Sequence, residues 1–177
     1  MKNLFLTLLC VSYLFALEQK NVLQAVPYVD VQKFSGLWYE IARTYNDYQE
    51  RCVASSVEYI LKNQKEYEIH NRCFDTHIRG RLIEYKGSAE SSNDDTNMSK
   101  IDMTYFWIFT KRYEVFFLEE DYSSAVVADR KLEQLWILSR SPTIDENALQ
   151  KIHAVLENVM DLKRLIYTSQ DALGRYK

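Results

Sequence analysis

The chain of 177 residues carries 22 Lys and Arg against 25 Asp and Glu, a net charge of -3, so it lacks the strong positive charge of a dedicated nucleic-acid-binding protein. Hydrophobic residues make up 47% and charged residues 27%, and 4 Gly and 2 Pro are too few for a repetitive or linker-rich chain, so the composition indicates one globular domain. Aromatic residues make up 14%, which favours a β-rich fold because flat rings suit a pleated surface.

The N-terminal segment has the pattern of a secretory signal peptide. An apolar run from Leu4 to Leu17 follows Lys2 and is shorter than the roughly 20 residues that span a bilayer. With Ala16 near its end, it predicts a signal peptide over residues 1–16 and a single mature domain over residues 17–177. A buried core helix is the alternative reading of this run.

Cys10 lies inside the apolar run and raises the question of a lipid anchor. Leu9 stands before it, where a lipid-anchored bacterial protein carries a small residue. We therefore expect an exported protein, periplasmic or secreted, that is released in soluble form. No later segment is long and apolar enough for a membrane span, and the sequence does not indicate an oligomeric state.

Two cysteines remain after the predicted cleavage, Cys52 and Cys73. They flank two β-prone runs around a polar turn at residues 62–66, so a hairpin would bring them together near its open end. In an exported chain this predicts a disulfide. A free nucleophilic thiol is one alternative. A metal site from His70, Cys73 and His77 is another, but alternation along a strand would point His70 and Cys73 to opposite sides, and we expect exposed histidines instead.

The middle of the chain reads as strands joined in sequence. Asp30 can cap a short helical turn that ends at Gly36. Closely spaced strands with polar turns between them favour an up-and-down antiparallel barrel or a sandwich. The eight predicted strands are Trp38–Thr44, Val53–Leu61, Tyr67–Phe74, Leu82–Ala89, Lys100–Trp107, Tyr113–Glu119, Ser124–Asp129 and Leu135–Arg140.

The period changes after Ser141. Thr143 and Glu146 have the spacing of a capping box. Apolar residues then recur at helical spacing, which predicts one helix lying against the outside of the sheet; these are Ala148, Leu149, Ile152, Val155, Leu156, Val159 and Met160. Lys163–Thr168 can form a last short strand, and we expect a frayed tail from Ser169.

Three short motifs in order resemble the signatures of the lipocalins. FSGLWYEIAR, residues 34–43, is similar to the first signature, with Gly36 and Trp38 at its diagnostic positions. Asp121 and Tyr122 match the second signature and Arg140 the third. LWILSRSPTI, residues 135–144, is most similar to the bacterial lipocalin and apolipoprotein D-like branch, and the resemblance covers residues 30–168.

The resemblance implies a fold and a function. It implies an all-β protein, an eight-stranded up-and-down antiparallel barrel with one C-terminal helix packed outside. Trp38 would close one end with Arg140 stacked over it, so the signature residues would be structural. Eight strands enclose room for one small ligand, and the family binds and carries small hydrophobic or amphiphilic molecules, here a fatty acid or lysophospholipid by preference.

Alternation from Trp38 assigns the side chains that face the barrel interior. The set is apolar and aromatic with a few hydroxyl groups and one amide, which suits an elongated apolar ligand with a polar head. Gly87 and Ala89 would leave room in the cavity, whereas Glu40 needs a partner and is expected to form hydrogen bonds near the plugged end. The candidate ligand-binding residues are Ser55, Val57, Tyr59, Ile69, Asn71, Gly87, Ala89, Met103, Tyr105, Tyr113, Val115 and Trp136.

Two other classes of function stay open. A few lipocalins are enzymes, one with a thiol nucleophile inside the barrel, which would need Cys52 or Cys73 to be free. An interaction module with an empty barrel would act through surface loops such as Ser91–Asn97. Because no catalytic, phosphate-binding or metal-binding motif is present, we predict a carrier that is not an enzyme and uses no cofactor and no metal.

Overall fold

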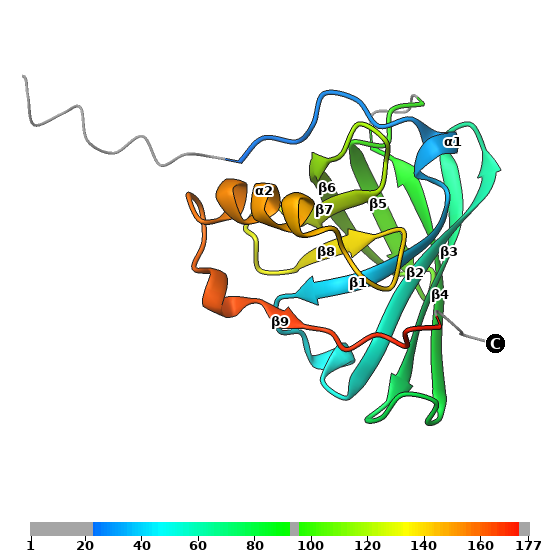
Figure 1. Cartoon of the computed structure of the whole chain (residues 1–177). Coiled ribbons are helices and arrows are strands. Elements are labelled where there is room, and N and C mark those ends of the chain that lie inside the picture. Colours follow the sequence, from blue (N-terminus) through cyan, green and yellow to red (C-terminus); the bar gives the residue numbers. More distant parts are fainter. Residues whose placement is uncertain (1–22, 93–95, 174–177) are drawn as a thin grey trace, which may run out of the picture.

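The structure is a computed structural model that describes residues 23–92 and 96–173. The predicted signal peptide and Cys10 lie outside these residues. Figure 1 shows strands wrapped into a barrel, with a helix and a short strand outside it. The barrel closes because β1 pairs with both β2 and β8, and every other neighbour in the barrel is the next strand in sequence. The predicted up-and-down antiparallel barrel is confirmed.

The eight barrel strands agree with the predicted ones within a few residues at each end. The exception is the turn between β5 and β6, described below. The strands are β1 Gly36–Arg43, β2 Cys52–Asn63, β3 Glu66–Asp75, β4 Leu82–Ser91, β5 Lys100–Tyr105, β6 Phe109–Leu118, β7 Ser124–Ala128 and β8 Leu135–Ser139.

One end of the barrel is closed by the signature residues. The Asp30 carboxylate caps helix α1, Val31–Phe34, by accepting bonds from the N–H groups of Gln32 and Lys33. The Arg140 guanidinium lies 3.8 Å from the centre of the Trp38 ring, so the predicted cation–π pair is present. It also donates to the carbonyl groups of Lys33 (2.6 Å) and Leu37 (3.0 Å), which ties the helix to β1.

Two further signature residues hold the same closed end. The Tyr122 hydroxyl accepts a bond from the Asp30 N–H at 3.0 Å, and the Asp121 carboxylate accepts one from the Ser123 N–H at 2.9 Å. Gly36 has φ +93°, a conformation that side chains disfavour, and an added Cβ would lie 3.4 Å from Arg140 Nη1. These contacts explain the signature as an end plug.

Helix α2, Glu146–Leu156, packs on the outside of the barrel as predicted. Its buried residues Ile152 and Leu156 belong to a second apolar cluster, which they form with side chains of β1, β6, β7 and β8. The predicted capping box is wrong. Asp145 caps the helix, because its carboxylate accepts a bond from the Ala148 N–H at 3.0 Å.

Residues 169–173 lie against the barrel, which corrects the expectation of a frayed tail for this part of the segment; residues 174–177 lie outside the described residues. The predicted last strand is reduced to β9, Ile166–Tyr167, which pairs with β1. Beyond it, the Ser169 carbonyl accepts a bond from the Ala54 N–H at 2.8 Å, and the Gln170 amide donates to the carbonyl groups of Glu40 and Ser55. A bulge at Ala54, with φ 50°, frees these β2 groups for the tail.

The hairpin between β5 and β6 differs most from the prediction. The sequence favours a strand through Trp107 and the next strand from Tyr113, whereas the structure ends β5 at Tyr105 and starts β6 at Phe109. Phe106 and Trp107 form the turn with φ of 53° and 61°. Aromatic residues rarely adopt this left-handed conformation, so strand propensity gave no signal of a turn here.

Candidate ligand cavity

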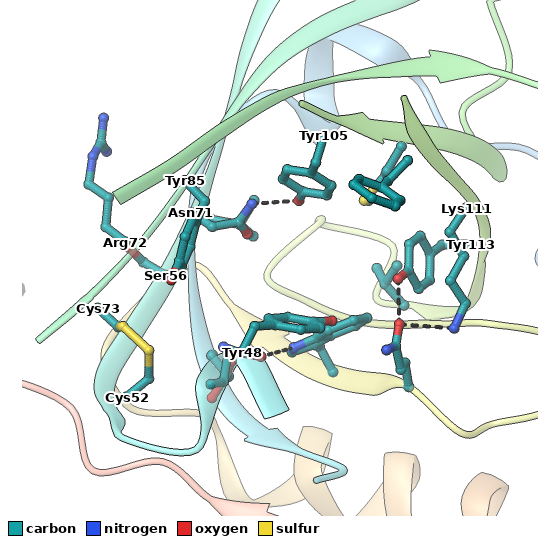
Figure 2. Close-up of a pocket in the computed structure, with 18 of the residues that line it drawn as sticks. Tyr48, Cys52, Ser56, Asn71, Arg72, Cys73, Tyr85, Tyr105, Lys111 and Tyr113 are labelled. Carbon is teal, nitrogen blue, oxygen red and sulfur yellow. Dashed lines mark hydrogen bonds between the residues drawn. A yellow bond between two sulfur atoms is a disulfide. The ribbon is translucent and has the colours of Figure 1, made fainter. Parts of the chain in front are cut away.

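The open half of the barrel contains a cavity of about 620 Å³. Figure 2 shows side chains from several strands converging on it, Tyr105 and Tyr113 among them. Its volume lies within the range of small-molecule sites, roughly 300–1,000 Å³. Seven predicted residues line it: Val57, Tyr59, Asn71, Met103, Tyr105, Tyr113 and Trp136.

The floor of the cavity is an aromatic layer above the plug. The Tyr59 ring lies 5.1 Å from that of Phe34 and 5.3 Å from that of Tyr67, in edge-to-face arrangements. Phe34 in turn lies 4.9 Å from Trp38. These rings fill the closed half of the barrel, so the space for a ligand begins above Tyr59.

Five predicted residues lie outside the cavity lining. Ile69, Ala89 and Val115 have no exposed surface and pack in the core of the closed half. At Gly87 an added Cβ would overlap the Thr104 carbonyl oxygen and lie 2.9 Å from the Tyr105 ring, so β5 already fills the space beside the glycine. The β2 bulge places Ser56, instead of Ser55, among the lining residues. An inward side chain therefore lines the cavity only in the open half.

Residues at the mouth complete the site and were missed by strand alternation. Tyr48 and Gln49 come from a short 3₁₀ helix, Asp47–Gln49, between β1 and β2. Phe106, Ile108 and Phe109 come from the β5–β6 hairpin. Alternation applies only within strands, so it could not place loop residues; the apolar run at 106–109 was the one available signal.

Polar groups of the cavity are concentrated on the upper walls. The Gln134 amide oxygen accepts bonds from the Tyr113 hydroxyl (2.6 Å) and the Lys111 ammonium (2.9 Å), and Lys111 also pairs with Asp129 at 2.6 Å. Asn71 donates to the Tyr105 hydroxyl at 2.6 Å. A ligand would thus meet apolar rings below and hydrogen-bonding groups above.

The cavity tyrosines are neutral at physiological pH, and burial raises their pKa further above it. Desolvation raises the pKa of Tyr105 and of Tyr113 well above the ordinary value of a phenol. The Tyr48 ring is half exposed, but its hydroxyl reaches that of Tyr113, and desolvation there raises its pKa to about 12. These hydroxyl groups can serve as hydrogen-bond partners for a ligand but carry no charge at neutral pH.

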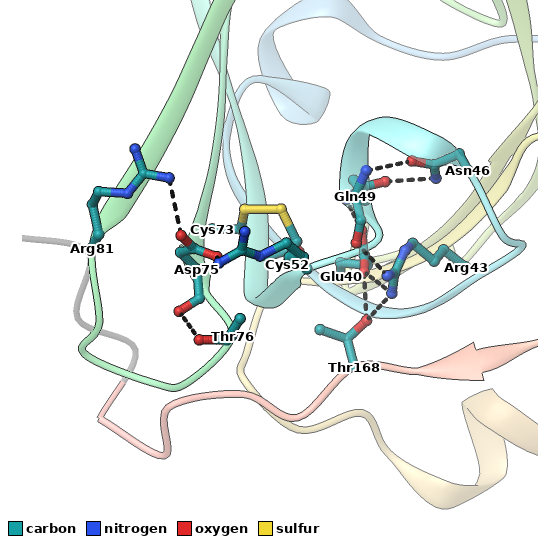
Figure 3. Close-up of a disulfide and its surroundings, with 12 residues drawn as sticks. Glu40, Arg43, Asn46, Gln49, Cys52, Cys73, Asp75, Thr76, Arg81 and Thr168 are labelled. Carbon is teal, nitrogen blue, oxygen red and sulfur yellow. Dashed lines mark hydrogen bonds and ion pairs between the residues drawn. A yellow bond between two sulfur atoms is a disulfide. The ribbon is translucent and has the colours of Figure 1, made fainter.

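Glu40 lies in the cavity wall beneath the loop that carries Gln49, which corrects the expectation that it lies at the plugged end. Figure 3 shows its carboxylate bonded to Arg43, Gln49 and Thr168. Burial raises the pKa of Glu40, and the bonds from Thr168, Arg43 and Gln49 oppose that rise. The network ties β1, the mouth loop and the C-terminal segment together.

The predicted disulfide between Cys52 and Cys73 is confirmed (Figure 3). It joins β2 to β3 near the open end, and both cysteines border the cavity. Among the described residues that line the cavity there is neither a free thiol nor a histidine. His70 is buried, contrary to expectation, because Glu68 and Glu84 enclose its ring on the outer side of the sheet.

The arrangement can enclose an apolar molecule and offers little for bond-breaking chemistry. The one buried carboxylate in its wall, Glu40, is already held by three side chains. In the described residues, no group of three or more His, Cys, Asp or Glu side chains could hold a metal ion. No helix within the same residues is long and apolar enough to cross a membrane.

Comparison with known proteins agrees with this geometry. The family model described as "Lipocalin-like domain" matches residues 29–170. The outer membrane lipoprotein Blc of Vibrio cholerae is 31% identical over 172 residues, covering 96% of this chain and 99% of the relative. Bovine apolipoprotein D is 23% identical over 151 residues, covering 80% and 77%.

Solved structures show the same fold. Insecticyanin from the tobacco hornworm Manduca sexta superposes with a TM-score of 0.68 at 17% identity, covering 86% of each chain. At this identity the likeness concerns the barrel and carries no information on the ligand.

Proposed function

The chain belongs to the lipocalin family, and on that premise we propose that it is an exported carrier of a fatty acid or lysophospholipid. Lipocalins in general bind small hydrophobic ligands. The observation that carries the proposal is the cavity of about 620 Å³, with an aromatic floor and hydrogen-bonding groups on its upper walls. An elongated amphiphile fits this gradient with its chain down and its head at the mouth.

Burial of the chain supplies enough free energy. Each methylene contributes about 0.8 kcal/mol, so about 12 methylenes give an upper bound near 10 kcal/mol before the costs of association. Micromolar affinity requires about 8 kcal/mol. The apolar wall therefore suffices without a specific polar contact, and we expect loose selectivity for chain length.

The head of the ligand would lie near Lys111. Its charge is already offset by Asp129 at 2.6 Å, so it is a weak site for a lone carboxylate. Hydrogen-bond donors and acceptors lie beside it on Tyr113, Gln134 and Asn71. This mixed rim favours tolerance of either a carboxylate or a zwitterionic phosphocholine head.

The enzyme alternative lacks its reactive group, because it needs a free thiol and both Cys52 and Cys73 are in the disulfide. The alternative of a surface interaction module requires a barrel interior that is packed with side chains or holds no ligand. An open apolar cavity of this size favours the carrier instead.

We further propose release in soluble form after export. A disulfide is typical of exported proteins, and a signal peptide over residues 1–16 would direct that export. The relative from Vibrio cholerae is named a lipoprotein, but Leu9 before Cys10 disfavours lipidation of this chain.

Quenching of Trp136 tests the proposal. Trp136 borders the cavity, so a fatty acid brominated along its chain should quench it saturably at one molecule per chain. Trp136→Phe should remove that part of the quenching and keep binding measured by calorimetry. Quenching that never saturates, or that is unchanged in Trp136→Phe, would reject a ligand in this cavity.

A further inference from the structure

We propose that the β5–β6 tip, formed by Phe106, Trp107, Ile108 and Phe109, inserts into the surface of a lipid bilayer and places the cavity mouth against it. The four consecutive side chains are 63%, 96%, 75% and 66% exposed. Soluble proteins expose single apolar residues commonly, but a contiguous group of this kind marks an interaction site.

The backbone holds these side chains outward at a tight turn. Tyr105 and Phe109 are the last pair of the hairpin, and Phe106 and Trp107 both have positive φ. Turns at such positions normally contain Gly, Asn or Asp, so bulky aromatic residues there are unfavourable for the fold alone. A left-handed conformation at two aromatic residues in succession is typical of a functional constraint.

The tip is continuous with the cavity. Phe106, Ile108 and Phe109 border the cavity mouth, while Trp107 points away from it into solvent. Figure 2 shows Tyr105 and Lys111, from the two strands of this hairpin, beside the cavity. Insertion of the tip would therefore place the opening at the surface from which an amphiphile leaves or enters a membrane.

A bilayer fits this surface better than a second protein chain does. The exposed area of the four side chains is on the order of 500–600 Å². A stable protein interface needs roughly 800 Å² on each partner. A protruding tip with a Trp at its apex is instead suited to the membrane interface, where Trp is enriched.

Charge around the tip predicts how it binds. Lys111 pairs with Asp129 at 2.6 Å, Arg112 with Asp102 at 2.8 Å and Lys86 with Glu84 at 3.6 Å. Each of these three cations, from β4 and β6, is thus paired with an acid, so their attraction to anionic headgroups contributes little. Binding should be apolar in origin and similar on neutral and anionic membranes.

Flotation with vesicles of phosphatidylcholine tests the proposal, using the exported and naturally processed chain, checked by mass to carry no acyl group. Wild-type protein should float with the vesicles and remain bound at high salt. Trp107→Gln should lower the partition coefficient roughly tenfold or more, because it removes the largest inserted side chain. Trp107→Phe should retain most of the binding.

Two controls separate this proposal from folding and from cavity binding. Tyr28→Gln removes a half-exposed aromatic residue near the closed end and should leave flotation unchanged. Trp107 is not a cavity-lining residue, so Trp107→Gln should keep its melting temperature and its affinity for a fatty acid in solution. Absence of fatty-acid binding by the wild-type protein would contradict the proposed carrier function and would leave the proposed membrane insertion of the tip unaffected.

Three results would overturn the proposal. One is wild-type protein that does not float. Another is Trp107→Gln that floats as well as wild type. The third is a wild-type dimer in ultracentrifugation that Trp107→Gln dissociates, without vesicle binding, which would assign the tip to a second copy of this chain.

Discussion

Filling the cavity and overfilling the closed core should have separable effects. Val57 borders the cavity on β2, whereas Ala89 has no exposed surface and packs in the closed half. Val57→Trp should exclude three or four methylenes of a bound chain, which costs roughly 2–3 kcal/mol of binding at about 0.8 kcal/mol each. That corresponds to about 30- to 150-fold weaker binding.

Ala89→Trp should affect stability instead. Overpacking of a filled core costs roughly 1–3 kcal/mol, and each kcal/mol lowers the melting temperature by about 2–4 °C for a chain of this size. Isothermal calorimetry with a fatty acid below its micellar concentration and a circular-dichroism melt, run on both variants, measure the two quantities. Weaker binding by Ala89→Trp at unchanged stability, or unchanged binding by Val57→Trp, would show that the boundary between core and cavity is misplaced.

Four further predictions concern the plug, the disulfide, the buried carboxylate and the N-terminus. Trp38→Ala should cost roughly 3–5 kcal/mol of stability; a normal denaturation midpoint with lost ligand binding would contradict its role as a plug. Alkylation without reductant should label neither Cys52 nor Cys73, and opening this loop should cost about 3 kcal/mol; two labelled thiols would refute the bond. Burial raises the folded-state pKa of Glu40 above its ordinary value of 4.5. Its contribution to stability is therefore full below 4.5 and is lost as the pH rises through the raised pKa. Glu40→Gln should flatten this loss of melting temperature with pH, and an unchanged slope would show that another group titrates. Growth with a labelled fatty acid in a bacterial host should leave the product unlabelled; label on a chain that begins at Cys10 would show an anchored protein.

Most of the barrel could be predicted because its signals are local. Strand alternation, polar turns and the change to a helical period after Ser141 each depend on neighbouring residues, and they located eight strands and one helix. The β5–β6 turn could not be read in this way, because Phe106 and Trp107 have high strand propensity and no turn chemistry. The contact of residues 169–170 with the barrel could not be predicted either, because it depends on a bulge at Ala54 whose partners are more than 100 residues away in sequence.

The cavity could be predicted only in part. Alternation identifies which side chains point inward, and it correctly brought Asn71, Tyr105 and Trp136 to one space. Alternation contains no information on position along the barrel axis, so it predicts Ile69 and Ala89 in the cavity although they lie in the filled half of the barrel. Where the filled half ends depends on how the rings of Trp38, Phe34 and Tyr59 pack on one another, which is a property of the whole fold.

Native mass spectrometry of the gently purified exported protein tests the carrier function most directly. The carrier account predicts a population with added mass, one molecule per chain, released on denaturation as a fatty acid or lysophospholipid. In the Val57→Trp variant, whose added ring fills part of the cavity, the fraction of chains that carry a ligand should be lower. A wild-type chain that is detected without added mass, and that still binds neither lipid after incubation with it, would contradict the account.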